Sequence, residues 1–336
     1  MKKTVSFAKN SVNLFFHILT TCNLKCRHCY INPSQHGRNT LSIKTIENWL
    51  TLFADKAQKA NVIFLGGEPT LHPDLALAVK KAGQLGYASI TIDTNGYLFN
   101  NILHKIKPVE IDYISFSLDG ATEYTNDLIR GKGSYKKCIA GIKQAAALGF
   151  NTSLIYTVSQ ANLHELEKMI PLISDLKIER FFIQVIGLRG NLAMPKPLKS
   201  NQGSMAQVGA DLWLKIIPKV AAAAARLGIR VTYPKVYLKP DELFECAGLV
   251  AKNYFVFPNG RVYRCPICED YPIHSLSIVD NKLSKRPKIN EMDLFGLKIP
   301  QGCVMNKIIQ PDNLPPEGKT GEQYKIACCL LKEEIF

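Results

Sequence analysis

A regular alternation of short apolar segments with helical segments, between residue 13 and about residue 235, constrains the fold most strongly. The apolar segments are rich in Ile, Val, Phe and Tyr, and they are short enough to be β-strands. Several are continuous apolar runs, which is typical of parallel strands buried on both faces. Strands are expected at residues 13–20, 62–66, 88–93, 113–118, 152–158 and 181–186.

The segments between these strands carry helix signals. Ser42 is a suitable N-cap, and Gly86 and Gly149 are typical of helix ends. Helices are expected at residues 41–60, 74–85, 134–148, 163–176 and 207–227. The repeated strand–helix unit predicts an α/β protein, either a βα barrel or an open sheet.

After about residue 235 the pattern changes, because Pro, Asn, Gly and Cys become frequent and helical periodicity fades. Two apolar segments on either side of Asn259-Gly260 predict a β-hairpin. Long loops are expected at 188–206 and 310–323. We therefore divide the chain into a core at 1–235 and a small cysteine-rich domain at 236–336. Its many loops predict that a bound metal contributes to its stability.

The ten cysteines are unevenly placed, with three at positions 22–29 and six between positions 246 and 329. Disulfide frameworks belong mostly to short secreted chains. His17 interrupts the apolar stretch before Cys22, which argues against an export signal. No apolar run is long enough for a membrane-spanning helix. We expect a cytoplasmic protein without membrane contact, whose reduced thiols bind metal.

The formal net charge of +14 favours anionic partners. These include nucleic acid and substrates that carry carboxylates or phosphates. Clusters of Lys and Arg interleaved with aromatic residues are missing, so nucleic acid is the less favoured partner. A hydrophobic fraction of 46% excludes wholesale disorder.

Cys22, Cys26 and Cys29 follow the first expected strand directly. Thiolates select iron–sulfur clusters, zinc or Cu(I). Three cysteines leave one iron of a cubane open, where a substrate can bind. The alternative is a Cys3His zinc site that uses His28.

Three further motifs each follow an expected strand. They are Gly66-Gly67-Glu68-Pro69, Asp93-Thr94-Asn95-Gly96 and Ser117-Leu118-Asp119-Gly120. Together with the cysteine motif and Tyr30, they make residues 10–235 resemble the radical S-adenosylmethionine (SAM) superfamily. The resemblance implies a partial (βα)6 TIM-like barrel, in which ligands bind at the carboxyl ends of the strands.

The resemblance also implies a site. Cys22, Cys26 and Cys29 would hold a 4Fe–4S cluster whose open iron binds the amino and carboxylate groups of SAM. The two glycines would let the backbone approach the cofactor, Glu68 would accept from its ammonium group, and Arg130 would meet its carboxylate. The residues expected at the SAM pocket are Tyr30, Gly66, Gly67, Glu68, Asn95, Ser117, Asp119 and Arg130.

The chemistry implied is reductive cleavage of SAM to a 5′-deoxyadenosyl radical, which takes a hydrogen atom from the substrate. The electron would come from a donor such as flavodoxin or ferredoxin. His28 is expected to be a bystander, and Cys138 a small buried residue.

The second cysteine group resembles the auxiliary-cluster extension called SPASM, or its shorter form, twitch. The most similar stretch runs from Phe257 to Pro266. Fewer cysteines are present than in a full SPASM domain, so one auxiliary 4Fe–4S cluster is expected. Its expected ligands are Cys246 and Cys265, with two more from Cys268, Cys303, Cys328 and Cys329. A four-cysteine zinc ribbon is the alternative. Four ligands would favour electron passage and three would favour substrate binding.

We expect an enzyme that acts on an anionic organic substrate during biosynthesis, such as a tetrapyrrole, a small metabolite or a peptide. The outcome, of oxidoreductase or transferase type, is left open. Only 21 residues precede Cys22, so a peptide maturase would need a separate leader-binding partner. Arg189, Lys196 and Lys199 are candidate substrate contacts. The rivals from other classes are a zinc-stabilised nucleic-acid-binding protein and a SAM-binding or electron-transfer protein without catalysis.

Overall fold

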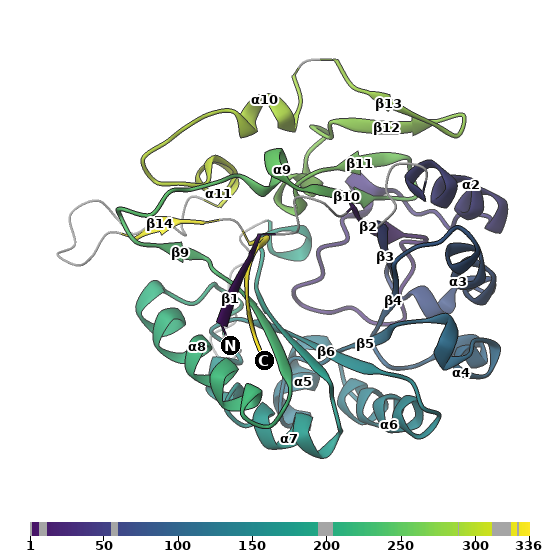
Figure 1. The fold of residues 1–336 in the computed structure, drawn as a ribbon, viewed down its shortest axis with the longest axis horizontal. Coiled ribbons are helices and arrows are strands. Elements are labelled where there is room, and N and C mark those ends of the chain that lie inside the picture. The colour runs from purple at the N-terminus through teal and green to yellow at the C-terminus, as the bar shows by residue number, and fades with distance from the viewer. Residues whose placement is uncertain are drawn as a thin grey trace.

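A computed structural model of the chain describes residues 2–6, 12–54, 60–193, 204–287, 289–310, 324–327 and 329–336. Its central feature is a curved, mostly parallel 13-stranded sheet in the order β1-β15-β8-β7-β6-β5-β4-β3-β2-β10-β11-β12-β13. Helices lie along the outer face of this sheet (Figure 1). The sheet is not closed, so the α/β fold is a partial barrel, as expected.

The six expected strands are all present and run parallel in chain order. Their bounds are β2 (Val12–His17), β3 (Ala60–Leu65), β4 (Ser89–Thr94), β5 (Tyr113–Ser117), β6 (Thr152–Val158) and β7 (Arg180–Val185). A further strand, β8 (Arg230–Pro234), continues the parallel sheet beside β7. Successive side chains of a strand alternate between its faces, so one set packs against the helices and the other faces the barrel interior.

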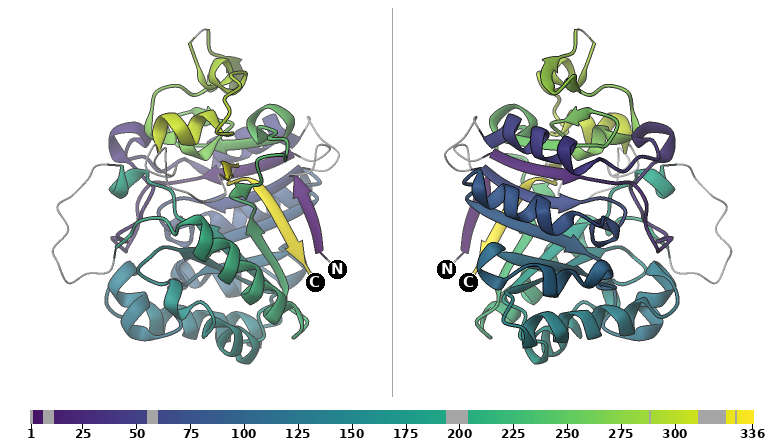
Figure 2. Two further views of the ribbon diagram at one scale, coloured as in Figure 1. Left: turned by 90° about the vertical axis from the view of Figure 1, so that its left-hand side faces the viewer. Right: turned by 90° about the vertical axis from the view of Figure 1, so that its right-hand side faces the viewer.

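The helices follow the strands in alternation and cover the outside of the barrel (Figure 2). They are α1 (Pro33–His36), α2 (Ile43–Ala54), α3 (Leu75–Gln84), α4 (Ile102–Lys105), α5 (Glu123–Arg130), α6 (Ser134–Ala147), α7 (Met169–Asp175) and α8 (Ala210–Ala225). Short 3-10 turns join them: η1 (Pro69–Leu71), η2 (Phe99–Asn101), η3 (Pro108–Glu110), η4 (Leu163–Glu165) and η5 (Gly190–Leu192).

Two helix predictions were wrong in part, one because the helix is divided and one because it ends too late. The helix expected at 163–176 is divided into η4 and α7, because Pro171 has no N–H to continue an upstream helix through this turn. The helix expected at 41–60 cannot reach Ala60, which begins β3. Residues 55–59 lie outside the described residues, as do parts of the loops expected at 188–206 and 310–323.

The segment after residue 235 extends the sheet at both edges. β10 (Lys252–Val256) lies parallel to β2, and β15 (Leu331–Ile335) lies antiparallel between β8 and β1 (Lys2–Ser6). The predicted hairpin is confirmed, since β10 pairs with β11 (Arg261–Tyr263) around a turn in which Gly260 has φ +81°. The boundary near residue 235 stays a prediction.

The other C-terminal elements pack around this hairpin. They are β9 (Tyr237–Leu238), α9 (Ala247–Val250), η6 (Pro266–Asp270), β12 (Leu276–Val279), β13 (Lys282–Lys285), α10 (Glu291–Phe295), α11 (Val304–Ile309) and β14 (Lys325–Ile326).

Two apolar clusters position the site. The larger lies between the sheet and its helices, with buried side chains such as Phe16, Phe64, Phe116 and Phe181. The smaller surrounds Phe257 and contains several cysteines of the C-terminal segment. In the part of the chain that the structure describes, no helix is both long enough and apolar enough to span a bilayer.

Candidate functional site

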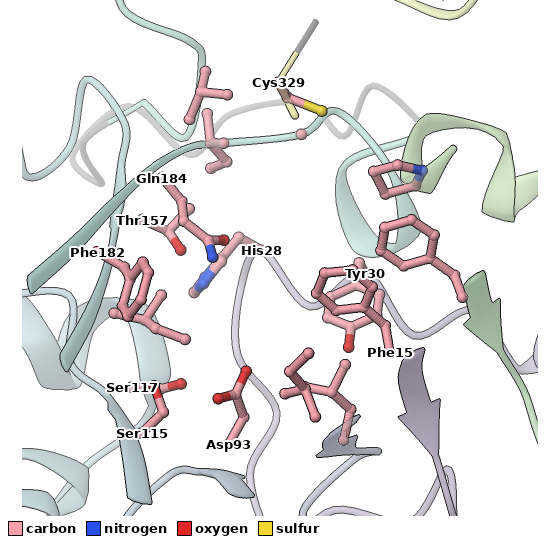
Figure 3. Close-up of a pocket in the computed structure, with 18 of the residues that line it drawn as sticks. Phe15, His28, Tyr30, Asp93, Ser115, Ser117, Thr157, Phe182, Gln184 and Cys329 are labelled. Carbon is pink, nitrogen blue, oxygen red and sulfur yellow. The ribbon is translucent and has the colours of Figure 1, made fainter. Parts of the chain in front are cut away.

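A cavity of about 660 Å³ occupies the interior of the curved sheet. The loop that carries the first three cysteines lines it, and so do side chains from β2 to β8. Figure 3 shows Asp93, Ser115 and Ser117 along one side of the cavity, with His28 and Gln184 nearby. The predicted site residues that line it are Cys22, Cys26, Cys29, Tyr30, Gly66, Gly67, Glu68, Asn95, Ser117 and Arg130.

Distant parts of the chain hold the cysteine loop in place. The Arg27 amide donates to the carbonyl of Ile129, at 2.9 Å. Asn191 donates twice, through its amide to the Cys29 carbonyl and through its side chain to the Cys26 carbonyl, each at 2.9 Å. The loop therefore depends on α5 and on the segment that follows β7.

The thiols of this loop are half-buried, and burial is the main cause of their high pKa values. It raises the pKa of Cys22 to about 12 and the pKa of Cys26 to about 11. Thiolates in such a place need nearby positive charge, which iron ions supply. His28 Nε2 lies 3.2 Å from Asp119 Oδ2, so this nitrogen is already engaged. Three soft donors on one loop fit an iron–sulfur cluster with an open iron better than a Cys3His zinc site.

No set of three or more His, Cys, Asp or Glu side chains within the described ranges already has the spacing of a metal site.

Gly66 and Gly67 contact the chain just before Cys22. A Cβ at Gly66 would lie 2.5 Å from the Leu19 carbonyl oxygen, and one at Gly67 would lie 2.2 Å from that of Thr21. The Gly67 and Glu68 amides donate to these same two oxygens. The end of β3 therefore supports the cysteine loop directly, and the predicted approach to SAM stays a prediction.

Glu68 joins the ends of β3 and β4. Its Oε1 accepts from the Thr70 amide (3.0 Å), the Thr70 hydroxyl (2.6 Å) and the Thr94 hydroxyl (2.8 Å), and its Oε2 accepts from the Asn95 amide at 2.7 Å. Burial raises the pKa of Glu68, while these hydrogen bonds oppose the rise. Oε2 is the oxygen with acceptor capacity left for a ligand.

Asp119 and Arg130 form a buried ion pair. Arg130 Nε lies 2.7 Å from Asp119 Oδ2, without the alignment of a hydrogen bond. Burial acts to raise the pKa of Asp119, but Arg130 and His28 outweigh it and lower this pKa to about 2. Arg130 lines the cavity, whereas Asp119 is not among the lining residues. His28, which we expected to be a bystander, thus contacts a buried carboxylate.

Sequence reasoning missed a contact between the first cysteine loop and the C-terminal segment. The Arg189 guanidinium lies 4.5 Å over the ring of Tyr30, pairs with the buried carboxylate of Glu269 and donates to the Pro266 carbonyl at 2.8 Å. The Tyr30 hydroxyl lies 2.7 Å from His17 Nε2. The only available signal was the position of Arg189 just after β7.

Lys196 and Lys199, the other candidate substrate contacts, lie outside the described residues.

Gly190 shows why the chain can pass so close to the cysteine loop at this point. Its φ is +58°, and a Cβ there would lie 2.3 Å from the Cys29 carbonyl oxygen.

The second cysteine group gathers in the smaller apolar cluster. Cys265, Cys268 and Cys303 are buried there, and Cys246 and Cys329 pack against them. The adjacent Cys268 thiol and burial together raise the pKa of Cys265, and burial raises the pKa of Cys303 to about 12. Cys329 also lines the cavity (Figure 3). Cys328 lies outside the described residues.

Glu291, another residue that sequence reasoning missed, holds the backbone at this group. It is fully buried, and it accepts from the amides of Arg264 (2.8 Å) and Cys265 (3.3 Å). It also accepts from the Ser275 hydroxyl at 2.7 Å. Glu291 therefore fixes the backbone directly before and at Cys265.

Comparison with known proteins adds independent evidence. The sequence model of the Radical SAM superfamily matches residues 17–173. The chain is 30% identical over 288 residues to a probable GTP 3′,8-cyclase of Saccharolobus solfataricus, covering 84% of this chain and 91% of that protein. It is 32% identical over 192 residues to the Fe-coproporphyrin III synthase of Methanosarcina barkeri, covering 55% of this chain and 47% of that protein. The chain thus spans about half the length of the synthase.

Two solved structures share the fold. Streptococcus suis SuiB matches with a TM-score of 0.60 at 16% identity, covering 90% of this chain and 68% of SuiB. Native anSMEcpe, solved with bound AdoMet and the Kp18Cys peptide, matches with a TM-score of 0.60 at 13% identity, covering 93% of this chain and 86% of anSMEcpe. At these identities the likeness concerns the fold alone. The sequence matches, together with the partial barrel and the cysteine loop that lines its cavity, establish that this chain is an enzyme of the radical SAM superfamily, whose cofactors are a 4Fe–4S cluster and SAM.

Proposed function

We propose that the chain cleaves SAM reductively at a 4Fe–4S cluster bound by Cys22, Cys26 and Cys29, and that it acts on an anionic organic substrate held in the cavity. The observation that carries the proposal is that these thiols line the same cavity as the residues that follow β3 and β4 and as Ser117 at the end of β5. When bound, the cofactors supply an electron and a 5′-deoxyadenosyl radical that removes a hydrogen atom from the substrate.

The residues of the chain position the reactants. The Glu68 Oε2 atom would accept from the SAM ammonium group, and the glycines before it fix the loop that would hold the cluster. Arg130 presents its guanidinium to the SAM carboxylate while Asp119 neutralises and orients it. Tyr30, Asn95 and Ser117 complete the pocket.

We also propose one auxiliary 4Fe–4S cluster in the second cysteine group. Cys246, Cys265, Cys268 and Cys303 are the favoured ligands, because Cys329 faces the cavity. A four-ligand cluster at this place would pass electrons. The external donor would be a flavodoxin or ferredoxin, in keeping with a cytoplasmic enzyme.

The substrate class is supported by cavity size and by charge. A volume of about 660 Å³ is within the range of small-molecule sites. The relatives named above carry the names of GTP and a coproporphyrin, both of them anionic molecules. A second candidate is maturation of a peptide with a separate leader-binding partner, because SuiB has been solved bound to its precursor peptide SuiA.

The test is anaerobic reconstitution with iron and sulfide, followed by reduction with dithionite in the presence of SAM. We expect brown protein that forms 5′-deoxyadenosine and methionine. Protein that binds iron but never cleaves SAM would contradict the proposal. Colourless protein that binds zinc and nucleic acid would favour the rival class instead.

A further inference from the structure

A row of polar side chains crosses the inner face of the sheet. The strand register places Asp93 opposite Ser115, Ser115 opposite Ser153, and Ser153 opposite Arg180. All four residues line the cavity. Asp93 lies one residue from the carboxyl end of β4, whereas Arg180 is the first residue of β7. The row therefore runs from the cofactor end of the cavity toward its opposite end.

The Arg180 end of the row has unused hydrogen-bonding capacity. Ser153 is fully buried, and neither its Oγ nor the buried Arg180 Nε has a hydrogen-bond partner among the described residues. The Arg180 guanidinium lies 4.1 Å over the ring of Tyr113, which fixes its plane. Buried polar atoms without partners are costly, so they indicate a ligand or ordered water at this place.

The neighbouring arginine differs in this respect. Arg230 follows Arg180 in the same row, but its Nε lies 3.9 Å from Glu334 Oε1. Among the described residues, no carboxylate lies within ion-pair distance of Arg180. The cavity thus presents one arginine that has a counter-ion beside one that does not.

The polar residues on the opposite wall bond to each other. Asn61 Nδ2 donates to Asn13 Oδ1, and Asn13 Nδ2 donates to Asn253 Oδ1, both at 2.9 Å. Asn13 and Asn61, which line the cavity there, are thus bonded to other side chains, whereas Ser153 Oγ and Arg180 Nε have no partner among the described residues. The difference points to the row as the ligand-binding side.

The Asp93 end of the row is an acceptor. Its carboxyl group points into the cavity, next to Ser115 (Figure 3). Burial raises the pKa of Asp93 to about 7, although the Ser115 hydroxyl opposes the rise. A ligand that donates a hydrogen bond or carries a positive charge would compensate this buried carboxyl.

We infer that Asp93, Ser115, Ser153 and Arg180 form a substrate-binding row for an elongated molecule with an ammonium group at one end and a carboxylate at the other. The carboxylate binds Arg180 and Ser153, because a guanidinium and a hydroxyl offer it several donors. The ammonium group binds Asp93. The inference deepens the proposed function and rests on it, since this molecule would be the part of the anionic substrate that lies along the row.

The register also sets the length of this molecule. Three steps between neighbouring strands, of about 4.8 Å each, separate the backbones of Asp93 and Arg180. Both side chains extend into the cavity, so the two charged groups of the ligand are separated by roughly 10 Å. The middle of the ligand then lies against Ser115, within reach of the cofactor side.

The test uses a series of unbranched ω-amino carboxylates of increasing chain length as probes. Binding to the reconstituted wild-type enzyme with SAM present is measured by titration calorimetry. We expect an optimum near aminooctanoate. Octanoate and octylamine, which each lack one charged group, should bind about tenfold to a hundredfold more weakly, as loss of a charge-assisted hydrogen bond predicts.

Variants assign the two ends. Arg180→Gln should weaken aminooctanoate binding by about tenfold or more and leave octylamine binding unchanged. Asp93→Asn should also weaken aminooctanoate binding by about tenfold or more, and it should leave octanoate binding unchanged. Arg230→Gln is the matched control and should change affinity by about twofold at most, because Arg230 already has a counter-ion.

Several outcomes would overturn the inference: no binding of any probe at millimolar concentration, no optimum of length, or equal losses in Arg180→Gln and Arg230→Gln. The wild-type series decides the matter even where a variant fails to fold. If SAM cleavage by the wild type fails while the length optimum is present, only the proposed function is contradicted. If cleavage is intact and the optimum is missing, only the substrate-binding row is contradicted.

Discussion

Several single residues of the site support the cysteine loop, in addition to lining the cavity or instead of it. Gly66 and Gly67 provide space for the backbone before Cys22, Asn191 binds two carbonyls of the loop, and Glu68 ties two strand ends together. The residues that surround a metal site control the orientation of its ligands. Substitutions here should therefore change metal binding even where no ligand atom is removed.

Replacement of Cys26 by alanine should abolish formation of 5′-deoxyadenosine and remove about four irons per chain, the content of one cubane. The measurement is iron content together with product analysis. Cys138→Ala is the matched control, because Cys138 is buried in α6 against the Ser117 carbonyl and belongs to neither cysteine group. Full cleavage by the Cys26 variant would refute the assignment of the first cluster.

Gly67→Ala should lower the free energy of unfolding by about 1–3 kcal/mol, because its Cβ would overlap the Thr21 carbonyl. It should also lower the iron content. Gly83→Ala is the control, since Gly83 lies in α3 and its Cβ would meet no atom closer than 3.9 Å. That control should be neutral or more stable by up to about 1 kcal/mol. Denaturant unfolding and iron analysis check both. Equal stability of the two variants would contradict the role of Gly67.

At the scale of elements, the partial barrel depends on strands from both ends of the chain. β15 lies between β8 and β1, so the last described residues join the edge strand β1 to the barrel strands. On the opposite side, β10 joins β2 to β11, β12 and β13. Each contributes backbone hydrogen bonds and covers apolar side chains that would otherwise be at an edge.

Truncation after Leu330 should lower the free energy of unfolding by about 3 kcal/mol or more, because it leaves β8 and β1 without their shared partner. Removal of Phe336 alone is the control, since this residue follows β15 and is 53% exposed. It should change stability by no more than about 0.5 kcal/mol. Urea unfolding measures both, and a truncated chain as stable as the control would show that β15 does not support the sheet.

How far the sequence predicts this fold depends on how local each signal is. The strands from β2 to β7 and the turn at Asn259-Gly260 were predicted, because apolar runs and turn residues are read within a few positions. The pairing of β15 with β8 and β1 was not, because it joins segments far apart in sequence. The same holds for Arg189 and Glu269: neither residue shows its partner in the local sequence.

At the scale of the whole molecule, one cavity connects two cysteine groups. Its lining includes Cys22 and Cys29 of the first group and Cys329 of the second. Between them lies the contact of Tyr30 with Arg189, whose carboxylate partner Glu269 directly follows Cys268. A substrate in the cavity would therefore lie close to both groups.

Cys265→Ala should reduce iron from about eight to about four atoms per chain while the first cluster still cleaves SAM. The reason is that Cys22, Cys26 and Cys29 lie on the loop that lines the cavity, whereas Cys265 is buried in the apolar cluster around Phe257. Iron analysis and electron paramagnetic resonance of the reduced protein check this, with Cys268→Ala as a second variant. Loss of all iron in both variants would show that the two groups do not bind metal independently.

Three asparagines form side-chain hydrogen bonds across β10, β2 and β3. These bonds affect the separation of the two cysteine groups. A slip of one residue between β10 and β2 would turn the Asn253 amide to the other face and break its bond with Asn13. The ladder therefore permits a single alignment of the late segment on the barrel. The distance between the two cysteine groups therefore depends on the register of β10 against β2.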